Sequence, residues 1–183
     1  MKKAILLAVV AVLALTVAAQ ASSVSFSWGA NFLSFSNTYV KMSVGQATQL
    51  NWYADDFGFG VRSESTTLSG SNYAGYTANL SVTEILVEKW LSKSVAVGLG
   101  IGSGTVTDVG SLFGTDTTAP VIDVRGTVQL LSGKGEKINA SLDFNLAARW
   151  MDTSYDLYDY QNSNSYSVKL DGTVASLAVT LGL

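Results

Sequence analysis

The amino-acid sequence predicts an all-β protein, an eight-stranded antiparallel up-and-down transmembrane β-barrel preceded by a cleaved signal peptide. Three observations predict the barrel. Apolar and polar residues alternate through most of residues 22–183, as strands with one apolar face require. Tight turns alternate with longer polar connections along the chain. Charged residues make up 14% of the sequence, against about 25% in soluble domains.

The first residues have the pattern of a signal peptide. Lys2 and Lys3 precede an uncharged apolar run at residues 4–19, and small residues flank Gln20. A positive region, an apolar stretch and a small-residue cleavage site define such a peptide, whereas a membrane-anchoring helix needs about 20 apolar residues. We therefore expect a signal peptide at residues 1–21 and one barrel domain at residues 22–183, with nine basic against 14 acidic residues.

The strands follow from the alternation and from the turn residues between them. They are expected near residues 24–35, 44–54, 57–64, 78–91, 95–107, 122–130, 138–150 and 166–183. Tight turns are expected at residues 55–56, 92–94 and 132–135, and long connections at 36–43, 66–77, 108–120 and 152–165. Short turns at one end and long loops at the other are typical of transmembrane barrels.

Two segments do not alternate cleanly. In residues 83–91 either face would carry a charge, so the sequence does not decide which face is polar. The last strand changes phase between Asp171 and Ala175, which predicts a β-bulge near Gly172.

The strand charges fall on the polar faces, which predicts an enclosed ion network with a structural role. An isolated buried charge costs several kcal/mol or more, so an interior should hold charges of both signs. Small polar residues accompany these charges and suit the narrow interior of an eight-stranded barrel. The expected lumen network has four positive and four negative members: Arg62, Glu64, Asp123, Arg125, Asp143, Arg149, Lys169 and Asp171.

Aromatic residues gather near the strand ends, as expected where rings lie among lipid headgroups. The expected interface aromatics are Trp52, Phe57, Trp90, Phe32, Trp150 and Tyr166. Core packing is the alternative for each single ring. The last long loop also carries Tyr155, Tyr158 and Tyr160 among small polar residues, a composition that suits surface contacts.

At this point the sequence resembles the small eight-stranded outer-membrane proteins of bacteria over essentially all of residues 22–183, on stretches such as 53–61 and 95–102. The resemblance implies insertion by an outer-membrane assembly machinery that reads the final strand. The usual signal alternates apolar residues and closes with an aromatic one. Leu177, Val179 and Leu181 keep the alternation, but Leu183 stands at the end.

The residues argue against several kinds of chemistry. The chain has no histidine and no cysteine, which removes the commonest general base, disulfides and thiolate chemistry. We therefore expect neither enzymatic activity nor a cofactor. We also expect no nucleic-acid partner, because an acidic chain without a basic run binds nucleic acid poorly. Asp152, Asp156 and Asp159 could offer oxygens to Ca²⁺, but their spacing does not match an EF-hand loop, and no metal site is predicted.

The sequence therefore favours an exported protein of the bacterial outer membrane with a structural or surface-interaction role, adhesion included, and no open pore. Its expected partners are outer-membrane lipids, lipopolysaccharide, the assembly machinery and an extracellular ligand. The alternative is a secreted or periplasmic soluble β-barrel that binds an apolar ligand inside. The two readings differ in whether the apolar strand faces point outward or inward.

Overall fold

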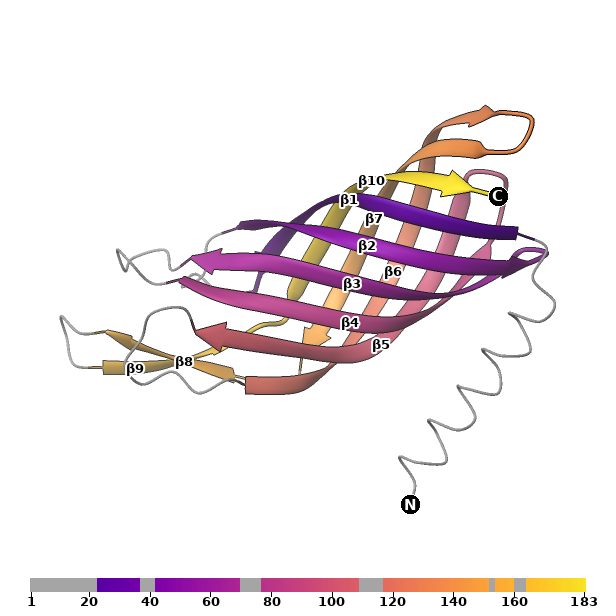
Figure 1. Ribbon diagram of the computed structural model, residues 1–183. Helices are drawn as coiled ribbons and strands as arrows, with labels where there is room; N and C mark the ends of the chain where they lie inside the picture. The colour runs from indigo at the N-terminus through magenta and orange to yellow at the C-terminus, as the bar shows by residue number, and fades with distance from the viewer. Residues whose placement is uncertain (1–22, 37–41, 70–76, 109–116, 152–153, 160–163) are drawn as a thin grey trace, which may run out of the picture.

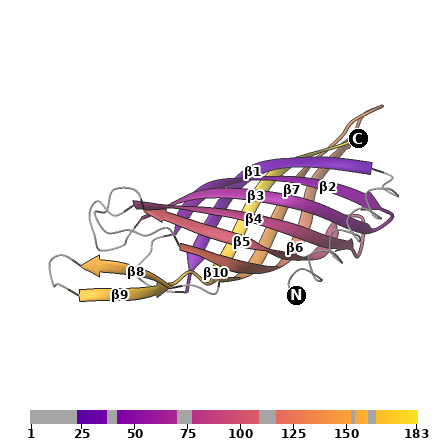
Figure 2. The same ribbon diagram turned by 60° about the horizontal axis from the view of Figure 1, so that its bottom comes forward.

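Eight antiparallel strands close into a barrel in the computed structural model (Figure 1; Figure 2). The structure describes residues 23–36, 42–69, 77–108, 117–151, 154–159 and 164–183; of residues 77, 108, 154–159 and 164–168 it describes the backbone alone. The barrel strands are β1 (Ser23–Phe35), β2 (Ser43–Ala54), β3 (Phe57–Ser69), β4 (Thr77–Trp90), β5 (Val95–Asp108), β6 (Thr117–Lys134), β7 (Asn139–Met151) and β10 (Gly172–Gly182). The predicted fold class, an eight-stranded antiparallel up-and-down barrel, is confirmed.

The barrel closes between its first and last strands. β1 pairs with β10 over eleven positions, from Ser25 opposite Gly182 to Phe35 opposite Gly172. At the end of this seam Val24 and Leu183 exchange backbone hydrogen bonds, at 3.3 and 2.8 Å. Every barrel strand therefore has a hydrogen-bonded partner on both sides, and the barrel has no edge strand.

Three short connections lie at the same end of the barrel as Ser23 and Leu183, and we call this the short-turn end (Figure 1). Asp55 and Asp56 join β2 to β3, and Asp55 has a φ of 54°, a conformation that Asp tolerates better than most residues. Residues 91–94 join β4 to β5, and residues 135–138 join β6 to β7.

The opposite end, which we call the loop end, carries the longer connections. Two of these connections have fewer residues than predicted, because β3 continues to Ser69 and β6 begins at Thr117. The last one contains a two-stranded sheet of β8 (Ser154–Asp159) and β9 (Asn164–Lys169). This β8–β9 hairpin extends beyond the barrel at the loop end (Figure 1; Figure 2).

The prediction of a final strand from residue 166 was wrong in its first third. Residues 164–169 pair with β8, and Leu170 and Asp171 separate them from β10. The phase change near Gly172 therefore marks the end of one sheet and the start of another. The register shift of the barrel lies instead in β6, between Gln129 and Leu131.

β6 is also longer than predicted. Ser132 and Gly133 have turn-forming character, but they pair with β7 opposite Ser141 and Ala140. The tight turn follows, with Gly135 donating its backbone N–H to the carbonyl of Ile138 at 2.9 Å. The β6–β7 hairpin consequently projects past the neighbouring turns at the short-turn end (Figure 1).

Candidate functional site

The lumen of the barrel has three layers. Nearest the loop end is a cluster of buried apolar side chains: Leu33, Leu68, Ala78, Leu80, Val82, Val106, Ala119, Val121, Ala147, Met151, Leu170 and Val174. Buried ions occupy the middle, and an open polar cavity occupies the short-turn half. Strands β3, β4, β6 and β7 contribute to all three layers, because alternate residues of each strand point inward.

Three arginines and three carboxylates form the middle layer, which we call the ion cluster: Arg62, Arg125, Arg149, Glu64, Glu84 and Asp123. Each side chain is at most 4% exposed. Arg62 lies 3.2 Å from Glu64 and 3.4 Å from Glu84. Arg125 lies 3.2 Å from Glu84 and 3.5 Å from Asp123. The cluster is electrically balanced and links β3, β4, β6 and β7.

Arg149 makes the best-formed contacts of the ion cluster. Its Nη1 and Nη2 donate to the two oxygens of Glu64 at 2.8 and 3.1 Å. Its Nε and Nη2 donate to the two oxygens of Asp123 at 2.9 and 2.8 Å. Two bidentate pairs share one guanidinium, and paired geometry of this kind is the strongest ionic hydrogen bonding that proteins form.

Two further lumen charges were missed by the sequence analysis. Glu84 and Glu88 point inward from β4, the segment in which the alternation was ambiguous. Apolar residues occur on both faces there: Val82 and Leu86 are buried, while Val87 is exposed. The signal that could have found the two acids was their own spacing of four residues, which puts them on one face of a strand.

Six of the eight residues predicted for the network are buried in the lumen, and Arg62, Glu64, Asp123, Arg125 and Arg149 are among the ion cluster. Asp143 lies closer to the short-turn end. Lys169 and Asp171 are not in the network: Lys169 ends β9 with an exposed side chain, and Asp171 accepts a hydrogen bond from the backbone of Met151 at 2.9 Å. The expected balance of four and four is therefore wrong, and the described residues bury three arginines and five carboxylates.

Glycines of β5 make room for the buried acids. A Cβ on Gly100 would lie 2.8 Å from Glu84 Oε1, and a Cβ on Gly98 would lie 3.0 Å from Glu88 Cγ. Neither position could carry a larger residue without moving a lumen carboxylate. The period-two glycines of this strand thus serve packing and not phosphate binding.

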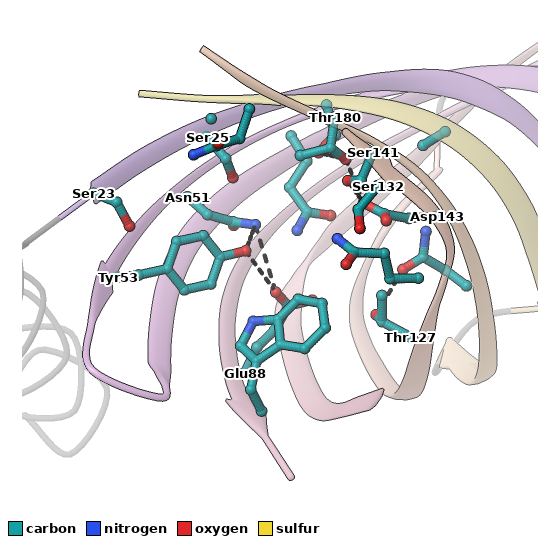
Figure 3. A pocket seen from close by; sticks show the side chains of 18 of the residues that line it. Ser23, Ser25, Asn51, Tyr53, Glu88, Thr127, Ser132, Ser141, Asp143 and Thr180 are labelled. Carbon is teal, nitrogen blue, oxygen red and sulfur yellow. Dashed lines mark hydrogen bonds between the residues drawn. The ribbon is translucent and has the colours of Figure 1, made fainter. Parts of the chain in front are cut away.

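The third layer is a cavity of about 690 Å³, which we call the cup. It reaches the rim at the short-turn end, where Asp55, Lys93 and Lys134 border it. Figure 3 shows Asn51, Tyr53 and Glu88 on one side of the cup, and Ser141, Asp143 and Thr180 on the other. Asp143 Oδ2 accepts hydrogen bonds from Thr180 Oγ1 at 2.5 Å and from Ser141 Oγ at 3.2 Å.

The outward faces of the barrel strands are apolar. Large hydrophobic side chains are exposed on every barrel strand, among them Trp28 at 56%, Val124 at 50% and Leu146 at 50%. Among the described side chains of the barrel strands, the outward faces carry one charge, Lys89, near the short-turn end. Lys89 lies 4.6 Å from the ring centre of Phe57 and 3.9 Å from Asp56. The large apolar side chains of the strands thus point outward and the buried ions inward, the opposite of the arrangement that the soluble alternative requires.

The predicted interface aromatics divide into three groups. Phe32, Phe57 and Trp150 are exposed on the outward face, and Trp52 is half-buried with its ring centre 6.5 Å from that of Phe59. Trp90 lines the cup instead, because it shares the inward face of β4 with Glu84 and Glu88. The remaining predicted residues cannot be compared in this way. Two lie outside the described residues, Asp152 and Tyr160, and five are described by their backbone alone: Tyr155, Asp156, Tyr158, Asp159 and Tyr166.

The described residues contain no helix that is long and apolar enough to cross a membrane. They also contain no group of three or more acidic, histidine or cysteine side chains that could hold a metal ion.

Comparison with known proteins identifies the fold. No family model matches the chain, and no curated protein sequence matches it. Among solved structures, the outer membrane protein OprG of Pseudomonas aeruginosa superimposes with a TM-score of 0.61 at 11% identity, covering 90% of this chain and 97% of that one. Neisserial surface protein A superimposes with a TM-score of 0.51 at 12% identity, covering 88% and 95%. The chain thus has the fold of small eight-stranded outer-membrane barrels.

The ion cluster predicts a specific pattern of stability. Replacing Arg149→Met leaves Glu64 and Asp123 without their main partner, and we expect the free energy of unfolding to fall by about 3–5 kcal/mol. Adding Glu64→Gln and Asp123→Asn to that variant should restore most of the loss, because the uncompensated charges are then gone. Urea unfolding of the refolded protein measures both changes. The exposed turn variant Lys93→Met should stay within about 0.5 kcal/mol of the original protein; an equal loss there would contradict the account.

Proposed function

We propose that this protein is an outer-membrane β-barrel that spans the bilayer as a closed cylinder and presents its loop end to the outside. The observation that carries the proposal is the orientation of the strand faces: large apolar side chains point outward all round the barrel while the ions are enclosed. Monomeric soluble proteins rarely expose contiguous apolar surface of more than a few hundred Å². In a bilayer the same surface meets acyl chains, and a closed barrel has no edge strand whose backbone groups would face lipid without a partner.

The proposed role is structural and not that of a diffusion channel. The interior of an eight-stranded barrel is just wide enough for side chains to fill. The ion cluster and the apolar cluster occupy the middle and the loop end of the lumen. We assign the protein no catalytic role, because each charge of the ion cluster is paired with charges of opposite sign.

We further propose a contact role for the β8–β9 hairpin. It pairs over six positions from Ser154 opposite Lys169 to Asp159 opposite Asn164, and it extends past the barrel at the loop end (Figure 2). Tyr155 and Tyr158 lie on β8, and tyrosines among small polar residues suit recognition surfaces. Loops held by a rigid scaffold are common sites of function.

The proposal includes a route to the membrane. Residues 1–21 are a signal peptide that is removed on export, and residues 22–183 are the barrel domain. The partners are outer-membrane lipids and lipopolysaccharide, together with the assembly machinery during insertion. Phe32 and Trp150 lie towards the loop end and Phe57 towards the short-turn end, where rings can rest among headgroups.

The membrane assignment predicts where a charge is tolerated. Val124 is half exposed on the outward face of β6, opposite Leu99 and Ala148. We expect Val124→Arg to lower the free energy of unfolding in lipid vesicles by about 2–4 kcal/mol, the cost of a cation near the bilayer midplane. The turn variant Ser92→Arg is the matched control and should change little.

Fractionation tests the same assignment in cells. The protein should stay with membranes through a carbonate wash and change its gel mobility on boiling. Recovery as a soluble monomer without detergent would contradict the proposal.

The contact role is tested by removing the hairpin. Replacing residues 154–169 with a short Gly–Ser linker leaves all eight barrel strands in place. We expect bacteria displaying this variant to adhere less to immobilised extracellular-matrix proteins than bacteria displaying the original chain. The double variant Tyr155→Ser with Tyr158→Ser keeps the hairpin and tests the two rings alone. Adhesion that is unchanged in both variants would overturn the contact role.

A further inference from the structure

Two carboxylates that line the cup do not belong to the ion cluster. Three arginines pair with Glu64, Glu84 and Asp123, whereas Glu88 and Asp143 form no ion pair with any residue that the structure describes. They are 4% and 7% exposed. Neutral groups donate to both: Asn51 and Tyr53 to Glu88 at 3.4 and 3.5 Å, and Thr180 and Ser141 to Asp143. Buried charge of one sign is costly, so the cup favours a cation.

Hydrogen bonding around the cup points the same way. Two side-chain oxygens of residues that line the cup, Asn51 Oδ1 and Asp143 Oδ1, have no hydrogen-bond partner among the described residues. Their residues are 3% and 7% exposed. The amide nitrogen of Asn51 is already used, because it donates to Tyr53 at 2.8 Å and to Glu88 at 3.4 Å. Both unpartnered atoms can accept a hydrogen bond, which favours a ligand that donates.

We propose that the cup is a binding site for a small organic cation with several N–H donors, of the diamine or polyamine class. Glu88 and Asp143 are its anionic contacts, and Asn51 supplies a further acceptor from the same cavity (Figure 3). A cavity of about 690 Å³ admits such a molecule together with water. The opening lies at the short-turn end, where Ser23, Asp55 and Leu183 border the cavity.

A bare metal ion fits the site less well. Ca²⁺ takes six to eight oxygen ligands at about 2.3–2.6 Å, usually several of them carboxylates. Within the described part of the chain no three acidic side chains converge. An ammonium group needs fewer contacts, since each N–H is satisfied by one acceptor.

The test is calorimetric titration of the folded protein in detergent micelles at low ionic strength, with putrescine as the probe. We expect putrescine to bind and 1,4-butanediol, which has the same length and no charge, not to bind. The double variant Glu88→Gln with Asp143→Asn should weaken putrescine binding about a hundredfold, because each charge-assisted hydrogen bond contributes on the order of tenfold. Glu136→Gln, in the β6–β7 turn outside the cup, is the matched control and should bind like the original protein.

Heat-dependent gel mobility checks that each variant is folded. Should the double variant fail to fold, amide chemical shifts of the original protein decide: putrescine should move those of Ser25, Asn51, Glu88 and Asp143. The proposal is overturned if putrescine does not bind, if the diol binds equally, if Ca²⁺ binds and putrescine does not, or if the folded double variant binds as tightly as the original.

Discussion

The paired burial of three guanidinium groups and three carboxylates inside the barrel is the constraint on which the rest of the structure depends. Arg149 lies 2.8 Å from both Glu64 and Asp123. If one of these strands exchanged its inward and outward faces, such ion pairs would be separated. Because side chains alternate along a strand, fixing the inward residues also fixes the outward ones, which include large apolar side chains on every barrel strand. The glycines of β5 follow from the same constraint, since Gly100 stands against Glu84.

The layering of the lumen separates a packed interior from two open ends. The apolar cluster and the ion cluster fill the interior from the loop end to the middle, so the barrel behaves as a rigid support. What remains open to other molecules lies at the two ends. The β8–β9 hairpin extends at one end, and the cup, with Glu88 and Asp143 in its wall, opens at the other. Each end can therefore change without disturbing the packed middle.

The alternation of residues was strong enough to predict the fold class, most strand positions and the inward direction of Arg62, Asp123 and Arg149. It failed where composition and pairing disagree. Ser132 and Gly133 look like turn residues, but they belong to β6 and pair with β7, because β7 is long enough to give them partners. Residues 166–169 alternate like the strand that follows, yet they pair with β8. Glu84 and Glu88 were missed because β4 has apolar residues on both faces, and only the three-dimensional pairing decides between them. The cup could not be predicted, since it depends on which side chains leave space unfilled.

The most direct test of the account compares the two faces of β7 in a bilayer. The chain has no cysteine, so single spin labels can be attached at Phe144→Cys, on the exposed outward face, and at Ser141→Cys, in the wall of the cup. Relaxation of the first label should respond to oxygen dissolved in the acyl chains, and that of the second to a water-soluble nickel chelate. A label at residue 144 that is reached by the nickel chelate, with one at residue 141 that is reached by oxygen, would show that the barrel faces are reversed.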